Sequence, residues 1–230
     1  MWSKLTVTSS GLQCPLRLTS RQVPLAADAG GDVFAAVCTP FGTRVLVGDV
    51  MGTGATARDT GRAVAAAWRE LAAAEPSLTG IAVRLHTLIA RSAHPERFVT
   101  ALLVTFGCTA DRAELVSCGH PPPLLLRGSS ASYVETFPAP PLGLMDLTDG
   151  WCSAVSIEFT AGDRMLLYTD GASEARDASR AEFPLAQRSL AAHQSGSAPD
   201  EEMLDGLLGG LRKHVGGQPA DDILLVLASR

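Results

Sequence analysis

The chain has 230 residues, of which 46% are hydrophobic, and its formal net charge is −5. This composition supports a sizeable core and excludes global disorder, while the length favours one domain. The negative charge and the lack of a Lys/Arg-rich block disfavour nucleic acid as a partner. There is no apolar run of membrane-spanning length and no signal-peptide pattern at the N-terminus, so we expect a cytoplasmic protein without membrane contact.

The cysteines are scattered along the chain and form no Cys-x-x-Cys pair; they are Cys14, Cys38, Cys108, Cys118 and Cys152. A zinc site or a dithiol redox motif is therefore unsupported. We expect reduced thiols that pack as small hydrophobic side chains in a reducing compartment.

The N-terminal quarter of the chain predicts a loose lead-in followed by a strand hairpin. Residues 1–14 carry little pattern, and residues 16–23 are a candidate edge strand. Two apolar runs, Val33–Val37 and Arg44–Val47, are joined by a Pro-Phe-Gly turn, which is typical of a hairpin.

Two helices are expected after the hairpin. Residues 55–74 are rich in strong helix formers, carry one apolar stripe, and are followed by Pro76, which ends the helix. A second apolar face predicts a helix over residues 79–92, and Ser77 or Thr79 can cap its start.

The rest of the chain predicts strands with one further helical stretch. One or two helices are expected within 185–215, around a Ser/Gly/Pro loop at 195–199. The expected strands are 100–106, 113–117, 124–127, 153–159, 164–168 and 223–228. Sets of strands with helix pairs between them do not follow a β-α-β-α alternation. They fit an α+β fold in which antiparallel sheets are covered by helix pairs.

Four acidic sites stand at the ends of apolar runs. They are Asp32 in Gly-Gly-Asp, Asp49 in Gly-Asp-Val-Met-Gly-Thr-Gly, Asp170 in Tyr-Thr-Asp-Gly, and the pair Asp221 and Asp222 before the last strand. A carboxylate at the edge of a buried strand is costly to desolvate unless a cation meets it. Each site alone is typical of a turn, but the set indicates a centre for a hard divalent metal.

The adjacent acids Asp221 and Asp222 leave one question open. Strand alternation directs neighbouring side chains to opposite faces, so only one of the two can be a metal ligand. The residues by themselves do not select between them.

The remaining motifs give little support for a nucleotide-binding loop or a serine hydrolase. The glycine-rich stretch 48–54 precedes a helix, as phosphate loops do, but it lacks the P-loop ending and the dinucleotide spacing. Its glycines are better suited to let a backbone carbonyl approach an ion. We interpret His120, in Gly-His-Pro-Pro-Pro, as structural, and no Gly-x-Ser-x-Gly setting supports a serine hydrolase.

Seven motifs follow one another along the chain: Gly-Gly-Asp, Gly-Asp-Val-x-Gly-x-Gly, Phe-Val-Thr-Ala, Gly-His-Pro-Pro-Pro, Pro-Leu-Gly-Leu, Tyr-Thr-Asp-Gly and Asp-Asp-Ile. This order resembles the bacterial PPM-type, protein phosphatase type 2C-like family of metal-dependent serine/threonine phosphatases, in the branch typified by the stage II sporulation protein E phosphatase domain. The resemblance covers residues 24–230, the expected phosphatase domain. It leaves residues 1–23 as a lead-in with a possible edge strand.

The resemblance implies an α+β, α-β-β-α sandwich of two antiparallel sheets flanked by helix pairs, with two Mn²⁺ or Mg²⁺ ions at one edge. It implies that Asp49 bridges both ions and that the backbone carbonyl of Val50 binds one. Asp170 and Asp221 would hold the other ion, and Asp32 would complete the site directly or through a water.

The activity that the resemblance implies is hydrolysis of phosphoserine or phosphothreonine on a signalling protein by a metal-activated water, without a covalent phospho-enzyme. The implied substrate is a phosphorylated anti-sigma factor antagonist. Because residues 1–23 are too short for the family's usual sensor domain, regulation is expected to come from a partner chain, from oligomerisation, or not at all. The resemblance also allows a homodimer formed near the first helix pair.

Three positions depart from the family pattern: Ala35 replaces an acid, Thr53 stands where Lys or another polar residue is common, and Leu224 replaces Thr. Ala35 is expected to weaken support around the metals. Two other functions stay open. One is a binding module that keeps the phosphatase fold without turnover, and the other is a phosphohydrolase that acts on a small metabolite.

Overall fold

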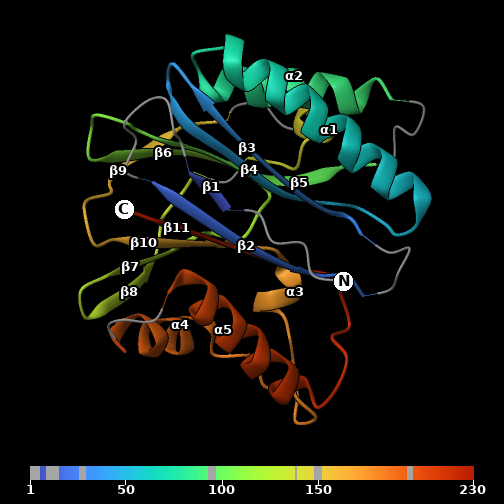
Figure 1. Ribbon diagram of the computed structural model, residues 1–230. Helices are drawn as coiled ribbons and strands as arrows, with labels where there is room; N and C mark the ends of the chain where they lie inside the picture. The colour runs from blue at the N-terminus through green and yellow to red at the C-terminus, as the bar shows by residue number, and fades with distance from the viewer. Residues whose placement is uncertain are drawn as a thin grey trace.

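The computed structural model describes residues 6–8, 16–25, 30–92, 97–137, 139–147, 152–195 and 199–230. Within these residues, two antiparallel sheets lie face to face and helices cover both outer faces (Figure 1). This arrangement confirms the predicted α+β sandwich of two antiparallel sheets flanked by helices.

The first sheet has six strands in the described part of the chain, in the order β1 (Thr6–Thr8), β2 (Arg17–Val23), β11 (Ile223–Ser229), β10 (Arg164–Tyr168), β7 (Leu124–Arg127) and β8 (Ser130–Tyr133). The second sheet has five in the same residues, in the order β3 (Asp32–Thr39), β4 (Gly42–Val50), β5 (Val99–Phe106), β6 (Arg112–Cys118) and β9 (Val155–Glu158).

The helices form the two outer layers. The pair α1 (Ala55–Ala74) and α2 (Leu78–Ala90) packs on the five-stranded sheet. The pair α4 (Leu185–Gln194) and α5 (Asp200–Val215) packs on the six-stranded sheet (Figure 1). Two short pieces, α3 (Asp170–Ser173) and the 3-10 turn η1 (Met145–Leu147), lie in connections.

Strand alternation divides the core into three apolar layers. In β4, Val45 and Val47 lie between the two sheets, whereas Leu46 packs toward α1 and α2. In β11, Val226 lies between the sheets and Leu225 packs under α4 and α5. Central strands are therefore buried on both faces, which explains why they occur in the sequence as continuous apolar runs.

Most predicted elements are present with small shifts of their ends. The hairpin is β3 and β4, which pair antiparallel down to Thr39 and Gly42 at the turn. The first helix has the predicted bounds. The second begins at Leu78, where the Ser77 side chain accepts a hydrogen bond of 3.2 Å from the backbone N–H of Gly80. The stretch 185–215 divides into α4 and α5.

The prediction of an edge strand at residues 16–23 needs correction. The strand exists as β2, but it pairs with β11 on one side and with β1 on the other, so β1 takes the edge of the sheet. No element was predicted for β1, which lies within the expected loose lead-in, or for β8 and α3; these elements are only three or four residues long. The division of the chain into residues 1–23 and 24–230 stays a prediction.

The cysteines that the structure describes are free thiols. Cys118 is buried, Cys108 and Cys152 are half-buried, and Cys38 is exposed, while Cys14 lies outside the described residues. Among the helices of the described residues, none has the length and apolar character needed to cross a bilayer.

Candidate metal centre

Asp32 and Asp49 lie side by side on neighbouring strands. Asp32 begins β3 and stands directly opposite Asp49, near the end of β4. Directly opposed residues in an antiparallel pair project from the same face of the sheet. Asp49 has the same strand parity as Val47, which lies between the sheets. Both carboxylates therefore belong to the inner face of the five-stranded sheet.

Asp170 and Asp221 come from the other sheet. Asp170 starts α3, two residues after β10, and Asp221 lies two residues before β11. These two strands are hydrogen-bonded neighbours, with Tyr168 opposite Leu225. The segments after β10 and before β11 approach closely, because a Cβ on Gly171 would lie 2.0 Å from the carbonyl oxygen of Asp222. Asp170 and Asp221 are therefore held at the same end of the six-stranded sheet.

The acids from the two sheets lie close enough to raise one another's pKa values. Burial, then the charges of Asp170 and Asp221, raises the pKa of Asp49 to about 7. Burial and the charge of Asp49 raise the pKa of Asp32 well above its ordinary value, with a smaller opposing effect of the Thr169 hydroxyl. Burial and the charge of Asp221 also raise the pKa of Asp170. Negative charge therefore accumulates at this edge.

The adjacent acids Asp221 and Asp222 differ in their surroundings. Asp222 is buried, and its two carboxylate oxygens accept the backbone N–H groups of Leu25 at 2.6 Å and Gly31 at 3.2 Å. It therefore ties the segment before β3 to the start of β11. Asp221 is exposed, and one of its oxygens accepts the N–H of Asp222 at 2.8 Å. Asp221 is the one of the two with open coordination sites.

The oxygens around Asp49 fit a divalent cation. A buried oxygen of Asp32, Oδ2, has no hydrogen-bond partner among the described residues. A Cβ added to Gly31 would lie 2.4 Å from Oδ1 of Asp49 and 2.7 Å from the carbonyl oxygen of Val50. The space beside two oxygens therefore exists only because residue 31 is glycine. Carboxylate and carbonyl oxygens are the donors that Mg²⁺ and Mn²⁺ prefer.

The acids do not form a closed cage. Across the described ranges, no three His, Cys, Asp or Glu side chains converge closely enough to hold an ion by themselves. A cation at this edge would therefore take part of its coordination from the Val50 carbonyl and from water, which Mg²⁺ commonly retains in proteins. The donor set fits such an ion.

Two cavities of about 400 Å³ each open beside the acids. One is lined by Asp32 together with Arg58 and Arg62 of α1, and the other by Asp170, Asp221 and neighbours such as Glu174. The acidic edge is therefore flanked by open cavities on both sheets.

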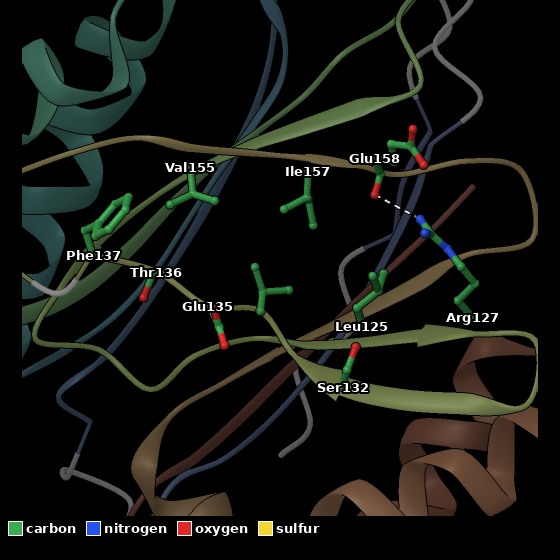
Figure 2. Close-up of a pocket in the computed structure, with 10 residues that line it drawn as sticks. Leu125, Arg127, Ser132, Glu135, Thr136, Phe137, Val155, Ile157 and Glu158 are labelled. Atoms are coloured by element: carbon green, nitrogen blue, oxygen red, sulfur yellow. Dashed lines mark hydrogen bonds between the residues drawn. The ribbon is translucent and has the colours of Figure 1, made fainter.

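A third cavity, of about 590 Å³, lies between the β7–β8 hairpin and β9 (Figure 2). Apolar side chains such as Leu125, Val155 and Ile157 line it, and Arg127 donates a 3.0 Å hydrogen bond to the backbone carbonyl of Glu158 at its rim. None of the four acids lines it, so this groove is separate from the candidate metal centre.

Three residues near the acids had no role in the sequence analysis. Thr169 is fully buried between Tyr168 and Asp170, and its Oγ1 accepts the N–H of Leu224 at 3.0 Å. Gly31 and Thr100 matter through close approach to Asp49, Thr100 as its partner in β5. The pairing of the predicted strands at 44–47 and 100–106 is the signal that could have identified Thr100.

The sandwich and its acidic edge are those of a PP2C-like phosphatase domain. The family model described as Stage II sporulation protein E (SpoIIE) matches residues 39–230, and the chain belongs to this family.

One curated relative is the phosphoserine phosphatase RsbP of Bacillus subtilis (strain 168), with 30% identity over 87 residues. The aligned part is 38% of this chain and 21% of RsbP, so the chain corresponds to about a fifth of that relative's length.

Two solved structures share the fold. The PP2C phosphatase domain of SpoIIE from Bacillus subtilis, solved with a fragment of its regulatory domain, aligns with a TM-score of 0.79 at 15% identity, over 100% of this chain and 71% of that one. RsbX, solved in complex with magnesium, aligns with a TM-score of 0.71 at 14% identity, over 98% of each chain.

Proposed function

We propose that this chain is a metal-dependent phosphatase that removes phosphate from serine or threonine of a signalling protein. The observation that carries the proposal is the meeting of Asp32, Asp49, Asp170 and Asp221 at one end of two sheets in a SpoIIE-family fold. The magnesium bound by RsbX and the phosphoserine activity in the name of RsbP agree with it.

Each acid has a distinct part in the proposal. Asp49 and the Val50 carbonyl would hold one ion, and Asp49 would share the second ion with Asp170 and Asp221. Asp32 supports the site from β3, directly or through a water. Two ions held there would supply positive charge to the phosphoryl oxygens and acidity to water.

The chain's own residues provide the frame for the reaction. Water supplies the oxygen that bonds to phosphorus, and the serine or threonine oxygen leaves with a proton. Burial raises the pKa of Cys118 to about 12 and also raises the pKa of Cys152, so neither of these two thiols is suited to act as a nucleophile. Direct attack by water therefore fits the site better than a phospho-enzyme.

The proposed substrate class and partners are taken from the family resemblance. We propose a phosphorylated anti-sigma factor antagonist as substrate, with regulation by a partner chain at α1 and α2. On α2, Val83 and Leu88 are 47% and 41% exposed, and such side chains can contribute to a protein interface. A single monomer mass across protein concentrations in light scattering would argue against a homodimer through this face.

The test is phosphate release from a phosphoserine protein by the full chain with Mn²⁺ or Mg²⁺, compared with an Asp49→Ala variant. Loss of a bridging ligand should cost more than the roughly 10–100-fold that removal of a ligand's supporting partner costs. Asp59→Ala is the matched control, because Asp59 is exposed on α1 and paired with Arg62.

Each alternative function predicts its own result. A binding module would bind the phosphoprotein with metal present and release no phosphate, and a metabolite phosphohydrolase would cleave nucleotides or sugar phosphates but not the phosphoprotein. If Asp49→Ala retained wild-type turnover, the proposed role of the acidic edge would be wrong.

A further inference from the structure

His120 connects the two sheets at the end where the acids lie. Its Nε2 lies 3.0 Å from the backbone carbonyl oxygen of Tyr168, in the six-stranded sheet. Its Nδ1 lies 3.1 Å from Oγ1 of Thr100, in the five-stranded sheet. His120 is 6% exposed, so both contacts are shielded from water.

The two contacts define one neutral tautomer. A carbonyl can only accept, so Nε2 carries the proton and donates to Tyr168, while Nδ1 accepts from the Thr100 hydroxyl. Burial lowers the pKa of His120 to about 4, which keeps the ring neutral at physiological pH. His120 is therefore a fixed bridge with a donor end and an acceptor end.

The hydrogen bond donated by Nε2 of His120 fixes the backbone just before Asp170. The flanking strand β7 begins at Leu124, opposite Leu166, so at Tyr168 no strand partner remains on that side. His120 donates a hydrogen bond to the Tyr168 carbonyl instead, and the Tyr168 hydroxyl donates a 2.8 Å hydrogen bond to the carbonyl of Pro122. The segment 120–122 thus holds Tyr168 at two points, two residues before Asp170.

The hydrogen bond accepted by Nδ1 of His120 holds the side chain of Thr100, which lies beside Asp49. Thr100 is the β5 residue directly opposite Asp49, so its side chain lies on the same face of the sheet. The Gly119 turn that places His120 is itself constrained, because φ is +66° and a Cβ would lie 2.6 Å from Pro141. The His120 side chain therefore links the Thr100 side chain, opposite Asp49, to the backbone of Tyr168 near Asp170.

We infer that His120 is a positioning residue of the metal centre, which fixes the separation between Asp49 on one sheet and Asp170 on the other. The inference rests on the proposed function only in that these acids hold the ions. Groups that orient metal ligands without touching the metal typically change metal affinity by roughly 10–100-fold when they are removed.

The experiment measures Mn²⁺ binding to the full chain by calorimetry, independently of turnover, together with the melting temperature of each protein. Thr100→Val removes the hydroxyl at nearly constant shape, and His120→Gln keeps a donor but cannot bridge both partners. We expect each to raise the Mn²⁺ dissociation constant about tenfold or more, while Thr100→Ser, which keeps the hydroxyl, stays within about threefold of wild type.

His86 provides the matched control. It is also buried, with Nδ1 accepting the N–H of Gly143 at 3.1 Å and Nε2 lying 3.2 Å from Asp146, but these partners are outside the acidic edge. His86→Gln should lower the melting temperature and leave the Mn²⁺ dissociation constant within about threefold of wild type.

The inference is overturned if folded His120→Gln and Thr100→Val bind Mn²⁺ as wild type does, or if His86→Gln weakens binding equally. Should His120→Gln fail to fold, the Thr100→Val and Thr100→Ser pair decides. A wild-type chain that binds Mn²⁺ but hydrolyses no phosphoprotein refutes the proposed function alone, and one that binds no divalent ion refutes both.

Discussion

At the scale of single residues, which acids can bind a metal depends on which carboxylate oxygens already accept hydrogen bonds from the backbone. The positions of the four acids could be predicted, because each acid lies in a short motif at the end of an apolar run. The difference between Asp221 and Asp222 could not, because it depends on backbone N–H groups of Leu25 and Gly31, almost two hundred residues away. His120 was predicted to be structural; its two partners lie on different sheets, which the sequence does not reveal.

His120 makes stability depend on pH in a defined direction. Its pKa falls from 6.5 in the unfolded chain to about 4 in the folded one, mainly through burial. The unfolded chain therefore binds the extra proton first as pH falls, and stability is lost between about pH 6.5 and 4. The loss attributable to this residue is at most about 3 kcal/mol.

Denaturant unfolding of wild type and His120→Gln, measured across that pH range without metal, tests this expectation. The shared carboxylates cancel in the difference between the two proteins. The difference in unfolding free energy should shrink as the pH falls from about 6.5 to 4. A constant difference would mean that His120 does not change its pKa on folding.

At the scale of elements, periodicity predicted nearly all of the strands and helices but not their neighbours. The continuous apolar runs identify buried strands, yet they say nothing about order. The prediction that β2 lies at the edge of its sheet was therefore wrong. β2 lies inside the sheet, because β1 pairs with its outer side. The short elements β1, β8 and α3 were missed because three or four residues carry too little pattern to detect.

The close approach of the segment before β3 to β4 leads to a second prediction. Gly31→Ala would place a methyl group against Oδ1 of Asp49 and the carbonyl of Val50, so one of them must move. We expect the Mn²⁺ dissociation constant to rise about tenfold or more and the unfolding free energy to fall by about 1–3 kcal/mol.

A second glycine substitution serves as the control for this prediction. Gly206 lies within α5, and nothing lies within 4 Å of an added Cβ. Gly206→Ala should raise the unfolding free energy by about 0.5–1 kcal/mol and leave Mn²⁺ binding unchanged. Wild-type Mn²⁺ affinity in Gly31→Ala would contradict the proposed coordination by Asp49 and Val50.

At the scale of the whole molecule, the sandwich brings like charges from two sheets to one edge. The four acids at the ends of apolar runs already indicated a metal centre, but which ion each acid would hold was implied only by the resemblance to a family, since composition and spacing do not specify which strand ends meet. The core layers lower the free energy of the fold, and the acidic edge raises it, as the elevated pKa values of Asp32, Asp49 and Asp170 indicate.

Metal should therefore determine how an acidic residue affects stability. Without divalent ions at pH 7.5, Asp49→Asn should melt at a higher temperature than wild type, because it removes one charge from a repulsive set. With saturating Mn²⁺, wild type should gain stability by binding and the variant should gain little, which reverses the order.

Differential scanning fluorimetry of both proteins, with chelator and with Mn²⁺, measures this crossover. Asp59→Asn, on the exposed surface of α1, should melt like wild type in both conditions. Parallel shifts of wild type and Asp49→Asn on addition of Mn²⁺ would show that the ion does not bind at this edge.

The neighbouring residues Asp221 and Asp222 have a consequence for how such a chain can evolve. The residue that secures the backbone, Asp222, is not the one that we assign to the metal. Under the proposed function, a change at Asp221 alone would remove a metal ligand and keep the hydrogen bonds that Asp222 accepts from Leu25 and Gly31. One substitution would then separate the proposed phosphatase from a folded, inactive competitor for the same proposed substrate.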